Sequence, residues 1–294
     1  MLPMRADLAA VDIAAESAQP GLVRRSVRRL VGRELIEREE CIAEEVAVAL
    51  VYNEQPHAVM MLTPLDLDAF ALGFSLSEGI IESADELIEA RVVQLDQGLQ
   101  LAMRIPPQRL ERLLARPRSL EGRSGCGVCG TRHIGDVLRA PRRASAGLVV
   151  DAVALRRALQ QLSERQSLNA ATGAVHAAAW ATADGAVRWL CEDVGRHNAL
   201  DKLIGRLARE GVQAAHGFVV LTSRASFEMV LKAASAGITL VVAISAPTSL
   251  AVELADEAGI TLVGFARDDR FTVYTRPARV RVPAVSAAKS GEGS

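Results

Sequence analysis

The stretch FVVLTSRASFEMVLKAASAGITLVVAISAPTSLAVELADEAGITLVGF, residues 218–265, decides the fold of this chain. In it, three short apolar runs alternate with two amphipathic segments, which end at Gly237 and Gly259. Short runs rich in valine and isoleucine predict buried strands, and the amphipathic segments predict helices. Strands that alternate with helices in this way predict βαβ crossovers and therefore a largely parallel, buried sheet.

The same pattern extends upstream of this stretch. Residues 174–193 predict a hairpin, and residues 199–211 predict a helix whose leucine and isoleucine side chains repeat at helical spacing. Another helix is expected over residues 151–162. We therefore expect an α/β domain over residues 122–282, in which helices flank a mixed, largely parallel sheet.

A smaller α+β part is expected over residues 24–121. Two strands, EVAVALVYN (45–53) and HAVMML (57–62), precede a helix that Thr63 would cap and Pro64 would begin. A second hairpin and a short helix follow along the chain. The segments outside the two parts, residues 1–23 and 283–294, are predicted to be flexible tails.

Composition narrows the class of protein. The chain has 294 residues, a net charge of −1 and 50% hydrophobic residues, so it can bury a large core and has no global attraction for nucleic acid or an anionic membrane. Acidic residues interrupt the first twenty positions, so we expect no signal peptide, and the longest apolar stretch, residues 238–247, is too short to cross a membrane. Four cysteines in this length do not suggest a disulfide framework. We expect a cytoplasmic protein with reduced thiols.

Lysine is rare among the basic residues. Of the 34 lysine and arginine residues only Lys202, Lys232 and Lys289 are lysines. Arginine donates hydrogen bonds in pairs and suits phosphate, although a biased proteome would give the same excess. Only arginines at special positions therefore carry weight.

Such positions occur in the loops that follow the predicted strands, namely VGRHN (194–198), TSRAS (222–226), SAPTS (245–249) and ARDDR (266–270). The carboxyl ends of parallel strands meet at one edge, so we expect these loops to lie together. They bring Arg196, His197, Arg224, Arg267 and Arg270. Guanidinium groups beside helix N-termini predict a phosphorylated ligand. The alternatives are a solvated arginine rim, and Asn198, Ser226 and Ser249 as simple helix caps.

A CxxC pair, Cys126 and Cys129, lies in the glycine-rich segment GCGVCG (125–130). A structural zinc site needs four ligands, and His133 and His176 would have to complete the set that the two cysteines begin. A thioredoxin-like site would open a helix after a strand. A pliable loop flanked by cations instead favours a thiolate that accepts and releases sulfane sulfur.

Two further comparisons sharpen this interpretation. Base deaminases pair a PCxxC with an HxE motif, whereas here His176 is followed by Ala178 where the glutamate should be, which argues against a hydrolytic deaminase. The remaining cysteines, Cys41 and Cys191, lie in a charged segment and an apolar strand. We interpret both as structural.

Several strings resemble the FdhD-type formate dehydrogenase accessory sulfurtransferases. They are GCGVCG (125–130), TGAVHAAA (172–179), EDVGRHNALDKLIG (192–205), SRASFEMVLKAASAGI (223–238), AISAPTSLAVELADEAGITLVGFARDDRFTVYT (243–275) and FALGFSLSEGIIES (70–83). The resemblance runs from about residue 24 to 282. It implies a fold similar to cytidine deaminase and a homodimer.

The resemblance also implies the chemistry. Such a protein takes persulfide sulfur from a cysteine desulfurase and passes it to the molybdenum bis(guanine dinucleotide) cofactor, the bound acceptor, which activates the formate dehydrogenase apoenzyme. Cys126 would carry the persulfide and Cys129 would assist. Neither a permanently bound metal nor contact with nucleic acid or membrane is expected.

The acceptor-binding residues implied by FARDDR are Phe265, Ala266, Arg267, Asp268, Asp269 and Arg270, to which we add Arg196, His197 and Asn198. Two alternatives stay open: a cofactor-binding chaperone with dispensable cysteines, and a zinc site at the CxxC. The apolar hairpin HAAAWATADGAVRWL (176–190) is the candidate dimer interface.

Overall fold

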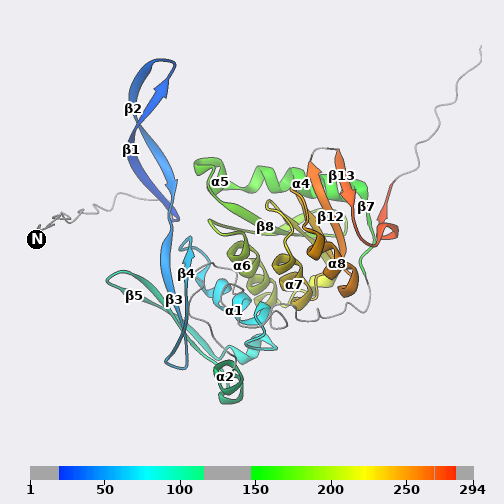
Figure 1. Ribbon diagram of the computed structural model, residues 1–294, viewed down its shortest axis with the longest axis horizontal. Coiled ribbons are helices and arrows are strands. Elements are labelled where there is room, and N and C mark those ends of the chain that lie inside the picture. The colour runs from blue at the N-terminus through cyan, green and yellow to red at the C-terminus, as the bar shows by residue number, and fades with distance from the viewer. Residues whose placement is uncertain (1–19, 116–146, 268, 283–294) are drawn as a thin grey trace, which may run out of the picture.

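The computed structural model describes residues 20–115, 147–267 and 269–282. They form two sheets with separate hydrophobic cores, joined by a helix contact, and a hairpin that projects from the body (Figure 1). The calls on Cys126, Cys129, His133, Asp268, residues 1–19 and residues 283–294 lie outside these residues. The last part of the predicted N-terminal tail is described, and Leu22 and Val23 are the first residues of a strand.

The larger sheet contains β8 (His176–Thr182), β9 (Val187–Asp193), β10 (Gly217–Leu221), β11 (Leu240–Ala243), β12 (Thr261–Arg267) and β13 (Arg270–Val273), in the order β13-β12-β11-β10-β8-β9. The pairs β10–β11 and β11–β12 are parallel, and the other three are antiparallel. Strands β9 to β12 consequently run in one direction, while β8 and β13 run against them. The expectation of a mixed sheet with most strands parallel is confirmed, and the likeness to cytidine deaminase stays a prediction.

Helices cover both faces of this sheet. On one face lies α4 (Ala152–Arg165), which α5 (Ser167–Thr172) follows, and on the other lie α6 (Arg196–Arg209), α7 (Phe227–Ser235) and α8 (Ser249–Ala258) (Figure 1). Alternation along β8 decides which side chain meets which layer: Ala177 and Ala179 pack toward α4, and Ala178 and Trp180 pack toward α6–α8. Burial of both faces explains why these strands are apolar throughout.

The smaller sheet contains β3 (Val46–Tyr52), β4 (Gln55–Leu62), β5 (Glu89–Leu95) and β6 (Gly98–Arg104), in the order β4-β3-β6-β5. Its inner face packs on α1 (Leu67–Ser77), and α2 (Pro107–Leu114) lies at its end. A third pairing joins β7 (Val150–Asp151) to β14 (Val280–Arg281). Short 3-10 turns occupy Ala84–Glu86, Ala214–His216 and Pro277–Arg279.

The first strands of the described structure are β1 (Leu22–Val31) and β2 (Glu34–Ala43), an antiparallel hairpin that we call the N-terminal arm. Its base packs on the α5 region through Leu22, Leu168 and Val175. The rest of the arm extends away from the body (Figure 1). The sequence patterns above did not predict these strands, because charged residues interrupt their apolar alternation.

Helices α1 and α6 cross with their backbones in contact, and this crossing joins the two hydrophobic cores. A Cβ atom on Gly73 would lie 1.7 Å from the carbonyl oxygen of Asp201, and one on Gly205 would lie 1.8 Å from that of Ala69. Any larger side chain would force the helices apart. The EDVGRHNALDKLIG string thus includes a glycine that the crossing requires.

Several local expectations need correction. The first long helix begins at Leu67, not Pro64, because the end of β9 engages Thr63: its N–H donates to Asp193 Oδ2 (3.1 Å) and its hydroxyl accepts from the Val194 N–H (3.2 Å). The caps of α6 and α8 are Gly195 and Thr248, whereas Ser226 does occupy the cap position of α7.

The first strand of the hairpin over residues 176–190 is buried within the sheet. Strand β8 lies between β10 and β9, and Trp180 is buried between sheet and helices. Apolar composition here serves the core of the chain itself. Strand β9 forms the edge of the sheet, and the dimer-interface prediction for this hairpin stays a prediction.

Candidate functional site

The loops after β10, β11 and β12 meet at one edge of the larger sheet, as the strand directions require. The Ala225 N–H donates to the carbonyl of Ala246 (3.2 Å), and the Thr248 N–H donates to the carbonyl of Ala225 (3.0 Å). The Phe265 N–H donates to the carbonyl of Ser245 (3.1 Å). These backbone bonds place TSRAS, SAPTS and the start of FARDDR side by side.

FARDDR forms the turn between β12 and β13. Phe265 has a φ of 51° and is 53% exposed, and the pairing of the two strands is irregular between Gly264 and Arg267. A left-handed phenylalanine costs about 1–3 kcal/mol, and such strain concentrates at ligand-binding positions. Ala266 instead points into the core, so that only its backbone can meet a ligand.

A cavity of about 400 Å³ opens at this turn. Its lining consists of Ser245, Phe265, Arg267, Arg270, Phe271 and Thr272. Two guanidinium groups supply charged donors, the hydroxyls supply neutral ones, and the phenyl rings supply flat apolar surface. This chemistry suits an anionic ligand that also carries an aromatic ring system. Asp269 is exposed in the turn beside it.

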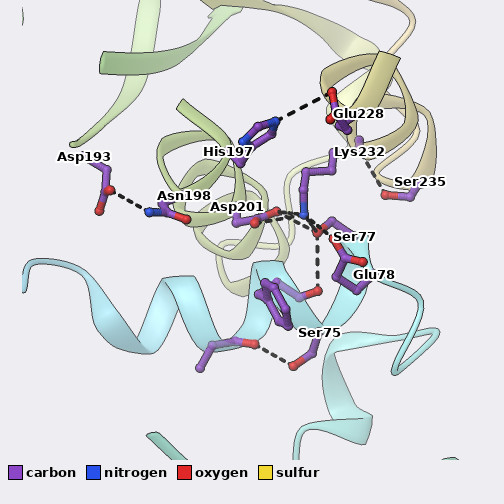
Figure 2. A network of polar contacts seen from close by, with 12 residues as sticks. Ser75, Ser77, Glu78, Asp193, His197, Asn198, Asp201, Glu228, Lys232 and Ser235 are labelled. Carbon is purple, nitrogen blue, oxygen red and sulfur yellow. Dashed lines mark hydrogen bonds and ion pairs between the residues drawn. The ribbon is translucent and has the colours of Figure 1, made fainter. Parts of the chain in front are cut away.

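The opposite end of the edge holds the first turn of α6. Ring atom Nε2 of the buried His197 lies 3.9 Å from Glu228 Oε2, too far for a hydrogen bond (Figure 2). Neither this atom nor Arg196 Nε has a hydrogen-bond partner among the described residues. Burial opposes ionisation of Glu228, but His197 and polar groups of the first turn of α7 outweigh it and lower the pKa of Glu228 to about 2.

His176 lies nearby at the start of β8. Its Nδ1 atom is 3.4 Å from the hydroxyl of Thr222. Burial, and then the neighbouring Arg196 and His197, lower the pKa of His176 and keep the ring neutral. Within the described ranges no three histidine, cysteine or acidic side chains are placed to hold a metal ion. The CxxC is outside those ranges, and the expectation of no bound metal there stays a prediction.

Asn198 faces away from the cavity and toward the smaller sheet. Its amide donates to the carbonyl of Met61 (2.9 Å) and to Asp193 Oδ1 (2.9 Å). Lys202, fully buried, pairs with Asp193 Oδ2 (2.6 Å) and donates to the carbonyl of Thr63 (2.9 Å). These contacts join the end of β9 to the loop before α1. They support a positioning role for Asn198.

A second buried lysine, Lys232 on α7, connects three helices (Figure 2). Its ammonium group donates to Asp201 on α6 (3.0 Å) and to Ser77 (2.9 Å) and Glu78 (2.7 Å) at the end of α1. Burial opposes this charge, but the carboxylates outweigh it and raise the pKa of Lys232. The rarity of lysine is the signal that would have found Lys202 and Lys232 from sequence alone.

Comparison with known proteins places the chain in a family. The model of the FdhD/NarQ family matches residues 43–281. The chain belongs to the FdhD/NarQ family. FdhD/NarQ membership accounts for the strings that surround the edge just described. It also agrees with the resemblance found in the sequence.

Individual relatives of the chain support the same family assignment. The chain is 54% identical over 266 residues to the sulfur carrier protein FdhD of Xanthomonas euvesicatoria pv. vesicatoria, covering 90% of this chain and 95% of that protein. It is 50% identical over 250 residues to that of Cupriavidus necator, covering 84% and 86%. A crystal structure of a protein assigned as a formate dehydrogenase accessory protein from Desulfotalea psychrophila matches with a TM-score of 0.68 at 25% identity, over 89% of this chain and 100% of that one.

No helix in the three described ranges is both long and apolar enough to cross a membrane.

Proposed function

We propose that this FdhD/NarQ family member is a cytoplasmic sulfur carrier for formate dehydrogenase. In this proposal it accepts sulfur from a cysteine desulfurase and delivers it to the molybdenum bis(guanine dinucleotide) cofactor, which is its substrate. The names of the relatives support the sulfur-carrier role. The observation that carries the acceptor side is the cavity of about 400 Å³ at the β12–β13 turn.

The cavity fits a guanine dinucleotide by its chemistry. Arg267 and Arg270 would bind phosphate oxygens, and their guanidinium forks match that geometry. Phe265 and Phe271 would pack against the base; Phe265 has a positive φ and its side chain is largely exposed. Arg196 and His197 lie farther along the edge and would extend the site of the same large ligand; their unpartnered nitrogens are buried, so neighbouring side chains would have to move before a ligand could reach them.

The sulfur step would use the two cysteines of the CxxC, whose roles come from the sequence. The Cys126 thiolate attacks the sulfane sulfur of the desulfurase persulfide; one S–S bond forms, another breaks, and the desulfurase cysteine leaves as a thiolate. The Cys129 thiolate then attacks Cys126, which releases hydrosulfide to the acceptor and leaves a Cys126–Cys129 disulfide. A dithiol reductant restores both thiols.

Persulfide loading tests the proposal. Incubation of the full chain with a cysteine desulfurase and cysteine should add the mass of one sulfur atom, and Cys126→Ala should abolish the addition. Cys129→Ser should still load but should release sulfide only when an external thiol is supplied. Unchanged loading of Cys126→Ala would overturn the carrier assignment.

A genetic experiment separates this proposal from a cofactor-binding chaperone. In a strain that lacks the gene, Cys126→Ser should fail to restore formate dehydrogenase activity, whereas the wild-type chain should restore it. Restoration by Cys126→Ser would mean that the cysteines are dispensable and that cofactor binding alone is the function. Cys41→Ser is the matched control and should restore activity.

A further inference from the structure

The first turn of α6 lies at the far end of the sheet edge that carries the cavity. The strands follow one another in the order β12-β11-β10-β8-β9, and only Val194 and Gly195 separate the end of β9 from the start of α6. Neighbouring strands are about 4.8 Å apart, so the three or four strand spacings from β12 put this turn about 14–19 Å from the cavity. A single small group therefore cannot contact both ends of the edge.

The backbone of this turn has donors without acceptors. No side chain caps α6, and the N–H groups of Arg196, His197 and Asn198 donate no hydrogen bond to another described residue. The first N–H groups of a helix have no partner within the helix, and the partial positive charge there favours an anion. Whether an anion can bind here then depends on the side chains of the turn.

Two side chains of the turn also lack partners. Arg196 forms no ion pair with a described residue, and its Nε is buried without a hydrogen bond. His197 is 7% exposed, and its Nε2 points from α6 toward α7, 3.9 Å from Glu228 Oε2 (Figure 2). A buried polar atom left unpaired costs about 1–3 kcal/mol, and a bound anion would satisfy such atoms.

The carboxylates around the turn are differently engaged. Asp193 accepts from Gly195 and Asn198 and pairs with Lys202, which fixes the opposite side of the turn. Glu228 faces His197 from α7, and its negative charge opposes an anion. A histidine that carries a proton on both ring nitrogens can donate to a carboxylate with one and to an anion with the other. The turn can therefore hold an anion once neighbouring side chains move aside from the buried nitrogens.

A third arginine lies between the two ends of the edge. Arg224 follows β10 in the TSRAS loop, is exposed, and forms no ion pair with a described residue. Hydrogen bonds of Ala225 place this loop beside SAPTS, whose Ser245 lines the cavity. Guanidinium groups thus follow one another along the edge from β12 through β10 to α6. Such a row matches a ligand that carries phosphate groups at intervals along its length.

We propose that the first turn of α6 is a second anion subsite, formed by Arg196 and His197, and that the edge selects an extended ligand with separated phosphates over a mononucleotide. The inference rests on the proposed function, since it concerns the same edge and the same kind of ligand. A mononucleotide in the cavity is shorter than the edge and leaves this subsite empty. A phosphate chain that leaves the cavity and passes Arg224 reaches it.

Isothermal titration calorimetry with inorganic pyrophosphate tests the subsite by itself. The full chain is first saturated with guanosine diphosphate, which occupies the cavity. The wild-type chain should then bind one pyrophosphate, and Arg196→Ala should weaken this binding about 10-fold or more by removing a charge-assisted pair of hydrogen bonds. Its affinity for guanosine diphosphate should be unchanged. Circular dichroism should show the variant to be folded, since Arg196 is partly exposed.

The matched control is Arg209→Ala, which removes an exposed arginine from the last turn of the same helix and should bind pyrophosphate as the wild type does. His197→Phe keeps a ring but loses both nitrogens, and should weaken pyrophosphate binding about 5-fold. Unchanged affinity of His197→Phe would remove this residue from the subsite. Absence of pyrophosphate binding to the saturated wild type would overturn the proposal, as would equal weakening by Arg196→Ala and Arg209→Ala.

Diguanosine tetraphosphate tests selection by length. It should bind the wild type about 10-fold or more tightly than guanosine diphosphate does, because the second contact becomes intramolecular. Arg196→Ala should remove this gain, and a variant that keeps it would overturn the selection.

The proposed function can fail separately from the subsite. Sulfur loading that persists in Cys126→Ala would end the carrier assignment and leave the pyrophosphate result intact. If guanosine diphosphate does not bind, the cavity assignment fails, and pyrophosphate titrated alone into the wild type and Arg196→Ala still decides the subsite.

Discussion

The cavity at the β12–β13 turn and the buried network around α6 use cationic side chains in opposite ways. Arg267 and Arg270 are exposed, and no carboxylate of the described residues pairs with them. Lys202 and Lys232 are buried, and each contacts several oxygens from different elements. A compact ammonium group can donate in three directions within a small space, whereas a guanidinium fork suits a planar or phosphate partner. The unpaired arginines remain available to a ligand, while the lysines hold the framework.

The largest expected effect concerns the buried lysines. Lys202→Met should lower the free energy of unfolding by about 3–5 kcal/mol, because Asp193 would stay buried without its cation. Urea unfolding followed by circular dichroism measures the change. Arg270→Met, at an exposed position, should change stability by less than about 0.5 kcal/mol. Equal losses from both changes would contradict the division of roles.

Nucleotide binding tests the role of the two exposed arginines. The double change Arg267→Ala and Arg270→Ala should weaken binding of guanosine diphosphate about 30-fold, or about 2 kcal/mol, by removing charge-assisted hydrogen bonds. Isothermal titration calorimetry measures the affinity. Arg188→Ala removes an exposed arginine from β9, away from the cavity, and should bind as the wild type does. Unchanged affinity of the double variant would place the nucleotide elsewhere.

A smaller effect concerns acid stability at the far end of the edge. The folded-state pKa of Glu228, about 2, lies below the ordinary value of 4.5, so that its ionised form stabilises the fold above about pH 4.5. This contribution, about 1–2 kcal/mol after solvent screening, should be lost as the pH falls toward about 2. Urea unfolding at several pH values should show a shallower acid dependence for Glu228→Gln than for the wild type. Identical slopes would show that Glu228 is not coupled to folding.

The smallest effect concerns His176. Because burial and the neighbouring cations lower its pKa, the unfolded chain binds this proton more readily than the folded chain. Stability from the neutral ring is therefore present above the ordinary pKa of 6.5 and declines as the pH falls below it. His176→Gln should reduce the loss of stability between about pH 7 and pH 5 by less than about 1 kcal/mol. A steeper loss in the variant would mean that the charged ring is favoured in the fold.

Local spacing predicted much of the architecture. The strands and helices of residues 218–265, the hairpin over 174–193 and the helix over 199–211 depend on periodicities that neighbouring residues establish among themselves. The meeting of TSRAS, SAPTS and FARDDR at one edge followed from strand direction alone. The start of α1 at Leu67 did not follow, because Asp193, distant in sequence, competes for the N–H of Thr63.

Part of the candidate site could likewise be predicted from the sequence, and part could not. That arginines and aromatic residues follow β12 could be read from FARDDR, but the cavity also requires Ser245 from another loop and Phe271 and Thr272 across the turn. Asn198 looked like a helix cap because its position after a strand permits one. Its side-chain amide instead donates a hydrogen bond to the carbonyl of Met61 in the smaller sheet.

The sequence by itself determined the βαβ alternation, the residue types at the carboxyl edge, the CxxC and membership in a family with a long shared motif. Only the tertiary structure decided the strand order with β8 inside β9, the contact of α1 and α6 through Gly73 and Gly205, and the buried contacts of Asp193 with Thr63 and Lys202. Periodicity is a local property of the chain, whereas strand order, helix crossing and burial depend on which distant surfaces exclude water together.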